Sequence, residues 1–219
     1  MWIREYLKSI SLSHAYRSSY SVGSYTTNTK YQEQGGYSFA RDQASNFYPA
    51  KEIGVVSVSE QFSPLMGVDA TLHNSLMVRF EMKKSRNLSL SFVNNQLTEV
   101  KSNEYVIGLG YRVKDIEFFI KSMTSGGNNQ RSRTSSDLNI KIDLSVKNNK
   151  TILRRIDEDI AQISAGRKMY TLNASADYSV SQRLNLRFYF NKNVNNPYIS
   201  TQFPTANTEG GISMTFTLQ

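Results

Sequence analysis

The sequence predicts an all-β protein: an antiparallel transmembrane β-barrel segment of about twelve meandering strands. The first observation is the alternation of apolar and polar residues from Lys168 to Thr217, which predicts a sheet with one apolar and one polar face. The second is that Tyr170 and Tyr178 bracket the apolar set. At ~3.3 Å per residue and a tilt near 45° they lie about 19 Å apart along a membrane normal, close to the roughly 25 Å apolar band of outer-membrane barrels.

Composition narrows the class of protein. The 219 residues are 39% hydrophobic with a mean hydropathy of −0.46, and no run approaches the ~18 consecutive apolar residues of a membrane-spanning helix. The absence of cysteine excludes disulfide scaffolds, thiol nucleophiles and zinc–cysteine sites. The net charge of +8 is scattered without a run of five like charges, so we expect no nucleic-acid partner. The length suits a single domain, 1–219.

The strands follow from alternation between polar or turn-forming stretches. In the first predicted strand one face is apolar or aromatic, with Tyr6, Ile10, Leu12 and Tyr16. His73–Ser75 is expected to form the turn between the third and fourth strands. Ser63–Pro64 is expected to turn the second strand into the third. The predicted strands are 6–22, 53–62, 65–72, 76–84, 88–92, 104–113, 116–122, 137–146, 151–156, 168–180, 184–191 and 211–218.

Connection lengths predict the orientation of the segment. Tight turns are expected at 85–87, 114–115, 148–149 and 181–182, whereas 23–52, 94–103, 123–135, 157–167 and 192–208 read as long loops. Short turns on one side and long loops on the other are typical of a barrel with periplasmic turns and extracellular loops. We therefore expect both termini of the segment in the periplasm, although the short His73–Ser75 turn falls on the long-loop side.

The two parities assign the side chains to two environments. Predicted to face lipid are Tyr105, Ile107, Leu109, Tyr111, Leu138, Ile140, Ile142, Leu144, Tyr170, Leu172, Ala174, Ala176, Tyr178, Leu184, Leu186, Phe188, Ile212, Met214, Phe216 and Leu218. Predicted to face the lumen are Arg79, Glu81, Lys83, Gly108, Gly110, Asp137, Lys141, Asp143, Asn173, Asp177 and Arg187.

The chemistry of an enzyme is missing from these patterns. The charged residues at i, i+2 and i+4, such as Asp137, Lys141 and Asp143, favour lateral ion pairs along a wet strand face over acid–base pairs. The histidines, His14 and His73, have no Ser or carboxylate constellation around them. No metal cluster or phosphate loop is present, and we expect neither a cofactor nor catalysis. Gly108 and Gly110 are expected to admit an aromatic ring or a backbone, or to sharpen barrel curvature.

Three stretches then point to a family: SLSHAYRSSYSVGSYTTNTKY at 11–31, FSPLMGVDATLHNSLMVRFEMKKSRNLSLSFVNNQLTEVKSNEYVIGLGYRV at 62–113, and NKTILRRID at 149–157. They resemble the C-terminal end of the SprA/Sov family, the outer-membrane translocon of the type IX secretion system, also known as the gliding-motility cell-surface protein of Bacteroidetes. The resemblance spans nearly the whole chain and is weaker at 32–50, 123–135 and 157–167.

The resemblance implies a single very large barrel of about 36 strands whose pore passes folded cargo. Its implied partners are outer-membrane lipid, secreted cargo proteins with C-terminal sorting domains, a plug protein and a PorV-type shuttle. The chain is far shorter than family members, and Met1–Glu5 lacks the features of a secretory signal, so we expect the export signal to lie upstream. Two alternatives remain open: a small complete porin-like outer-membrane barrel, and a soluble surface β-sandwich binding module.

Overall fold

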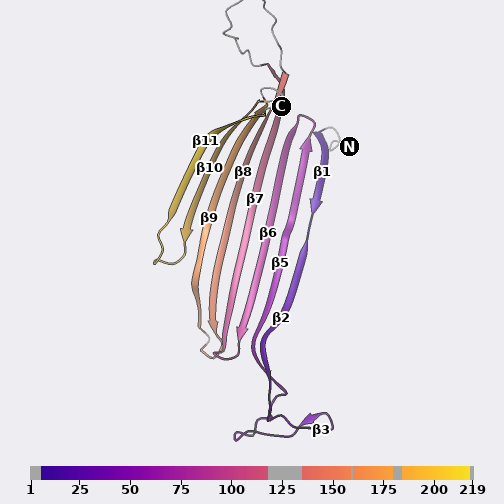
Figure 1. Cartoon of the computed structure of the whole chain (residues 1–219), viewed down its shortest axis with the longest axis vertical. Coiled ribbons are helices and arrows are strands. Elements are labelled where there is room, and N and C mark those ends of the chain that lie inside the picture. The colour runs from indigo at the N-terminus through magenta and orange to yellow at the C-terminus, as the bar shows by residue number, and fades with distance from the viewer. Residues whose placement is uncertain (1–5, 118–134, 159, 180–183, 218–219) are drawn as a thin grey trace, which may run out of the picture.

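The computed structural model describes residues 6–117, 135–158, 160–179 and 184–217, and within them it is built from strands (Figure 1). Nine strands form one antiparallel sheet, and two short strands form a separate hairpin. The strands are β1 (Leu7–Ser13), β2 (Tyr16–Thr27), β3 (Glu33–Gln34), β4 (Tyr37–Ser38), β5 (Lys51–Leu72), β6 (Leu76–Ser91), β7 (Gln96–Glu117), β8 (Ser135–Arg155), β9 (Ile160–Ser179), β10 (Leu184–Pro197) and β11 (Thr205–Phe216).

The main sheet is a meander in which sequence neighbours pair from β5 to β11. Its first edge consists of β1 and β2 in succession, because both pair with β5: β1 with the half that ends at Leu72, and β2 with the half that begins at Lys51. Its other edge is β11, which pairs with β10. The all-β, antiparallel prediction is therefore confirmed, whereas the described strands do not close into a barrel.

The predicted turn at Ser63–Pro64 is wrong, because β5 continues through it as one strand. The pairing of β5 with β6 shifts between Phe62 and Met66, so the proline lies in an irregularity where no ladder hydrogen bond needs its missing N–H. Opposite Pro64, the edge of the sheet is interrupted between β1 and β2. There Ala15 N donates to Pro64 O at 2.9 Å, and Ser63 N donates to Ala15 O at 3.1 Å.

The predicted turns at 85–87, 114–115 and 148–149 are also wrong, since each lies inside β6, β7 or β8. Polar residues there pair with polar residues of the next strand, as Ser85 does with Ser102 and Asn103 with Asn148. A sheet with water on one side accepts such residues at any point along a strand, so polarity alone does not mark its ends. Pairs of short predicted strands thus merge into long ones, and the count of about twelve is not confirmed.

The predicted loops shrink for the same reason. Most of 94–103 belongs to β7, most of 157–167 to β9, and parts of 23–52 and 192–208 to the strands that flank them. Position 135 begins β8, and the rest of the 123–135 loop, through 134, lies outside the described residues, as does the predicted 181–182 turn. The connections at the end of the sheet away from Leu7 are 28–50, 92–95, 156–159 and 198–204.

The turn at His73–Ser75 is confirmed, with Ser75 N donating to Leu72 O at 3.1 Å and Ser75 at φ 67°. The register places this turn at the same end of the sheet as Leu7 of β1 and Phe216 of β11 (Figure 1). Removing the false turn at Ser63–Pro64 changes the strand parity. The short His73–Ser75 turn therefore falls on the side of the termini. The predicted 123–135 loop falls on that side too, because Glu117 at the end of β7 pairs with Ser135 at the start of β8, so the predicted separation of short turns from long loops is wrong.

The sheet is a single layer without a core. Of the large apolar side chains in the described part of the chain, Tyr178 alone is buried, at 8% exposure. No described helix is long and apolar enough to cross a membrane. Because no described strand packs against either face, both faces are open in the part of the chain that the structure describes.

The segment between β2 and β5 stands beyond the far end of the sheet and carries the β3–β4 hairpin (Figure 1). Asp42 closes a turn there, since its carboxylate accepts hydrogen bonds from the backbone N–H of Ala44 at 2.9 Å and of Asn46 at 2.8 Å. These hydrogen bonds, that from Asn46 first, hold the pKa of Asp42 below its usual value. Arg41 stacks over the ring of Phe47 at 4.2 Å.

Candidate functional site

The cross-strand register gathers the predicted lipid-facing residues on one face of the sheet. One row runs Phe80, Ile107, Leu144 and Leu172 across four strands, and the next runs Val78, Leu109, Ile142 and Ala174. The same face continues through Leu184, Leu186 and Phe188 of β10 to Ile212, Met214 and Phe216 of β11. Leu218 lies outside the described residues. We call this surface the apolar face.

The apolar face is bare. Leu109 is 43% exposed and Ile212 69%, although side chains of this kind are normally covered in a folded protein. Tyrosines mark its limits: Tyr105 and Tyr170 lie in one cross-strand row through Val146, and Tyr178 lies in the row of Leu138 and Val113. An exposed apolar surface of this extent marks a place where another apolar phase or partner belongs.

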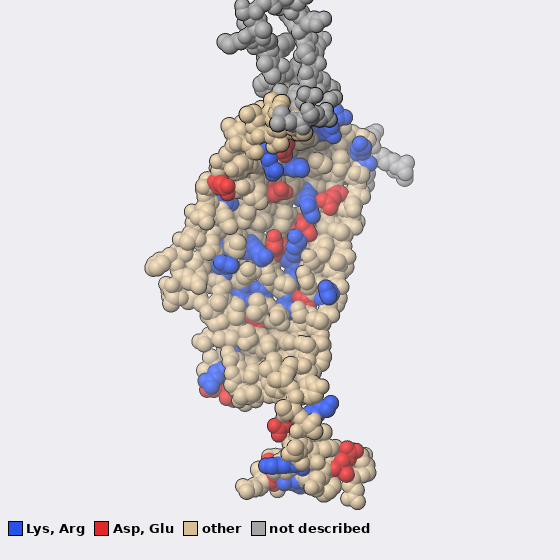
Figure 2. Space-filling model, in the orientation of Figure 1, with Lys and Arg blue, Asp and Glu red and all other residues tan. Residues whose placement is uncertain are grey.

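The predicted lumen-facing residues share the opposite, polar face. Arg79, Gly108, Asp143 and Asn173 form one cross-strand row, and Gly110 pairs with Lys141 in the next. Arg112, Asn139, Asp177 and Arg187 form another, with Asp137 at the same parity of β8. Figure 2 looks onto the face where Lys and Arg lie interleaved with Asp and Glu over the middle strands.

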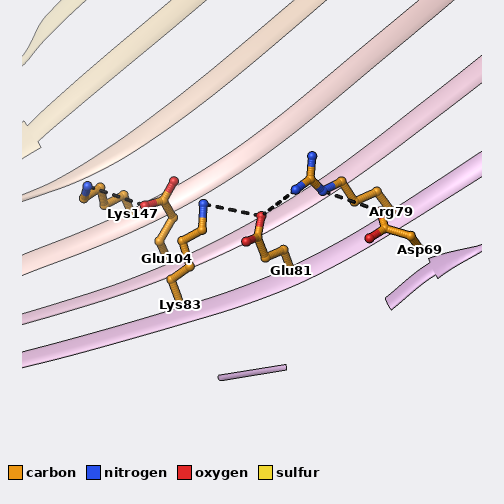
Figure 3. A network of polar contacts seen from close by, with 6 residues as sticks. All are labelled: Asp69, Arg79, Glu81, Lys83, Glu104 and Lys147. Carbon is orange, nitrogen blue, oxygen red and sulfur yellow. Dashed lines mark hydrogen bonds and ion pairs between the residues drawn. The ribbon is translucent and has the colours of Figure 1, made fainter. Parts of the chain in front are cut away.

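A line of ion pairs crosses this polar face (Figure 3). Arg79 contacts Asp69 of β5 at 3.6 Å and Glu81 of its own strand at 3.3 Å, and Lys83 contacts the same Glu81 oxygen at 3.3 Å. Glu104 of β7 pairs with Lys147 of β8 at 3.4 Å. Opposite charges thus sit side by side, as expected from their spacing.

Two more pairs lie toward the end of the sheet near the termini. Asp137 accepts a hydrogen bond from Nε of Arg112 at 2.8 Å. Arg187 contacts Asp177, its direct register partner, at 3.5 Å, and both remain well exposed. Each of these bases has an acid beside it, so this part of the polar face carries closely paired charges of both signs.

The glycines of the polar face make room for side chains. A Cβ on Gly108 would lie 2.7 Å from Oδ1 of Asp143 and 3.3 Å from Cβ of Arg79, and one on Gly110 would lie 3.0 Å from Cε of Met77. The expected aromatic or backbone neighbour is therefore wrong at these two positions. Gly211 has the aromatic neighbour that was expected at Gly108 and Gly110, because the ring of Tyr189 lies over it.

The polar face is hollowed over β8 to β11 into an open groove of about 470 Å³. Its lining mixes both charges with amides and hydroxyls, without a nucleophile and histidine side by side: Lys141, Asp143, Asn173, Ala174, Ser175, Arg187, Tyr189, Asn191 and Ser213. Nδ1 of His14 lies 2.6 Å from the carbonyl oxygen of Leu65, and this contact holds the imidazole ring in place. In the described ranges no group of three or more His, Cys, Asp or Glu could hold a metal ion.

Sequence reasoning missed a charged cluster on the apolar face, beyond the row of Tyr105. Glu99 of β7 is fully buried, and three cations cover its carboxylate: Arg86 at 2.6 Å, Lys101 at 3.0 Å and Arg154 at 3.0 Å. Arg86 and Lys101 are register partners, and Arg154 comes from β8. Their parity equals that of the apolar residues, which was the available signal, but Arg86 was expected in a turn and Glu99 and Lys101 in a loop.

No family model matches this chain, and no curated protein matches it.

Proposed function

We propose that the chain forms a section of the wall of an outer-membrane β-barrel, with its apolar face toward lipid and its polar face toward a water-filled lumen. The observation that carries the proposal is the bare apolar face of a single-layer sheet. Each large apolar side chain left in water forgoes roughly 1.5–3 kcal/mol of burial. Lipid supplies an apolar phase for the whole face at once.

The dimensions of the apolar face support this placement. Tyr105 to Val113, Leu138 to Val146 and Tyr170 to Tyr178 are stretches of about nine residues, the number that a tilted strand needs to cross a bilayer. Tyrosines at the ends of these stretches suit the two interfaces of the membrane. The strands themselves are longer, so their halves toward the 28–50 connection would project beyond the membrane, and both ends of the segment would lie in the periplasm.

The open edges favour a section of a larger barrel over the alternatives. A small complete barrel would pair β11 with β1 and β2, and in the described sheet these edges have no strand partner. A β-sandwich would cover the apolar face with a second sheet, and no described strand does so. Unpaired edges invite aggregation, whereas neighbouring strands of a larger barrel would satisfy both.

The function that we assign to this barrel is based on the resemblance to the SprA/Sov family. We propose that it conducts folded proteins with C-terminal sorting domains as the translocon of the type IX secretion system and supports gliding motility. A plug protein and a PorV-type shuttle would be its partners. Transport is a property of the pore, so no catalytic residue is assigned. A lining that carries ion pairs of both signs suits varied cargo, because its paired charges hold a charged solute only weakly.

The test has two parts. Carbonate washing of membranes should leave the protein in the outer-membrane pellet, and its release into the soluble fraction would contradict the membrane placement. Cells lacking the complete translocon should regain cargo export with the whole gene but not with residues 1–219 fused to an export signal. Export restored by these residues alone would favour a complete small barrel, with the wild-type translocon as the control.

A further inference from the structure

Six cations lie on the apolar face beyond its row of Tyr105, Val146 and Tyr170, in a basic band across four adjacent strands. Five of them lie within four residues of this row, and Arg154 lies farther out. The register gives them the parity of the apolar residues, without a shift in the β6–β7 and β7–β8 pairings involved. The basic band consists of Lys84 and Arg86 (β6), Lys101 (β7), Lys150 and Arg154 (β8) and Lys168 (β9).

The basic band is not neutralised. On the same face and in the same part of the described strands it meets two carboxylates, Glu60 and Glu99. Glu99 is enclosed by three of the cations, while the hydroxyl of Tyr16 lies 3.4 Å from Glu60. On the polar face, by contrast, Arg79, Lys147 and Arg187 each have an acid beside them on the neighbouring strand.

The cluster around Glu99 is preorganised. Its carboxylate fixes Arg86, Lys101 and Arg154 from one side, yet these side chains remain 40%, 41% and 45% exposed. The exposed parts of these three side chains therefore surround a buried anchor, as a binding site for a further anion requires. The ammonium of Lys168 lies 5.1 Å from the ring centre of Tyr170, at the limit of the apolar face.

We propose that the basic band binds the phosphate groups of lipid head groups in the outer leaflet. The inference rests on the proposed membrane placement. Lys84 and Lys168 are two residues, and Lys101 and Lys150 four, beyond the row of Tyr105, Val146 and Tyr170, so their depth is about 5–10 Å past that row at the tilt of a barrel strand. This is the depth of the head groups. Arginine and lysine clusters at this level recognise anionic lipids.

The experiment measures how much diphosphoryl lipid A the purified, delipidated protein retains in neutral-detergent micelles, with phosphatidylcholine as the uncharged probe. The test variant is Lys84→Gln/Lys150→Gln/Lys168→Gln. The matched control is Lys83→Gln/Lys141→Gln/Lys147→Gln, which removes the same charge from the opposite face. Each cation near a charged surface contributes roughly a factor of five, so the test variant should bind lipid A about 100-fold more weakly than wild type.

The control variant should bind like wild type, and phosphatidylcholine should bind all three proteins alike. Equal lipid A binding by wild type and test variant, or an equal loss in test and control, would overturn the basic band as the site. Carbonate washing of the same three proteins separates the two proposals: pelleted protein with unchanged lipid A binding refutes the basic band alone. Protein released from the membrane refutes both.

Discussion

The ring of Tyr189 in β10 lies over Gly211 of β11, its direct register partner. A Cβ on Gly211 would come within 2.7 Å of the tyrosine hydroxyl oxygen and 3.0 Å of a ring carbon. An aromatic ring that covers a cross-strand glycine protects a stretch of sheet that has no side chain of its own. The contact therefore holds the edge strand in register.

The first prediction tests this contact. Gly211→Ala should destabilise the protein by about 1 kcal/mol in urea unfolding from lipid vesicles, because the ring must move aside. The loss should shrink in a Tyr189→Ala background, giving a coupling of about 0.5 kcal/mol or more. Gly210→Ala is the matched control, since its Cβ would meet Phe190 at an ordinary 3.5 Å. Additive effects of the Gly211 and Tyr189 changes would contradict the contact.

The second prediction concerns the two faces. Arginine at Ala174 or Leu109, both on the apolar face, should cost about 2–4 kcal/mol if the face meets lipid at mid-depth. Arginine at Ser175, one residue along and on the polar face, should cost much less. Unfolding of the three variants from vesicles measures the difference. An equal loss of stability on substitution of Ala174 and Ser175 would show that the two faces meet the same environment.

The third prediction concerns Glu99. Replacing it with glutamine leaves Arg86, Lys101 and Arg154 facing one another without the negative charge between them, which should cost about 1–2 kcal/mol because the three cations are only half-covered. Glu104→Gln is the control, since Glu104 is partly exposed and forms an ion pair with a single cation, Lys147, among the described residues. It should change stability by less than about 0.5 kcal/mol. A larger loss at Glu104 than at Glu99 would contradict the account.

The fourth prediction concerns pH in the segment between β2 and β5. The folded pKa of Asp42 is lowered, so its contribution to the turn is present above the unfolded pKa and is lost as pH falls through the folded value. The amide resonance of Asn46 should therefore shift at a pH below the usual titration range of an aspartate. Asp42→Asn keeps an acceptor without a titrating group and should abolish this step. A step at the ordinary pH of an exposed aspartate would contradict the hydrogen bonds.

Side-chain parity could be predicted from sequence, whereas the ends of the strands could not. Ile107, Ile142 and Ala174 meet in neighbouring rows because a period of two survives any error in where a strand begins. Ser85 and Asn148 suggested turns, and Asn103 the end of a loop, because turn-forming residues usually interrupt strands that have a core to cover. This sheet has no such core, so these residues continue the strands.

The Glu99 cluster shows a second limit. Arg86, Lys101 and Arg154 come from three strands, and only the register between those strands brings them onto one carboxylate. Their segments carry no motif with a fixed spacing. Long-range pairing of this kind depends on strand lengths, which were the least predictable quantity in the chain.

The absence of a second layer has a consequence for how this sequence can vary. In a packed interior each side chain must fit the shape of several others, so its identity is constrained. Here a residue has neighbours beside it in the sheet and a fluid in front of it. We therefore expect leucine, valine, phenylalanine or alanine to exchange freely at positions such as Leu144 so long as polarity is kept, and unrelated-looking chains to be able to form the same wall.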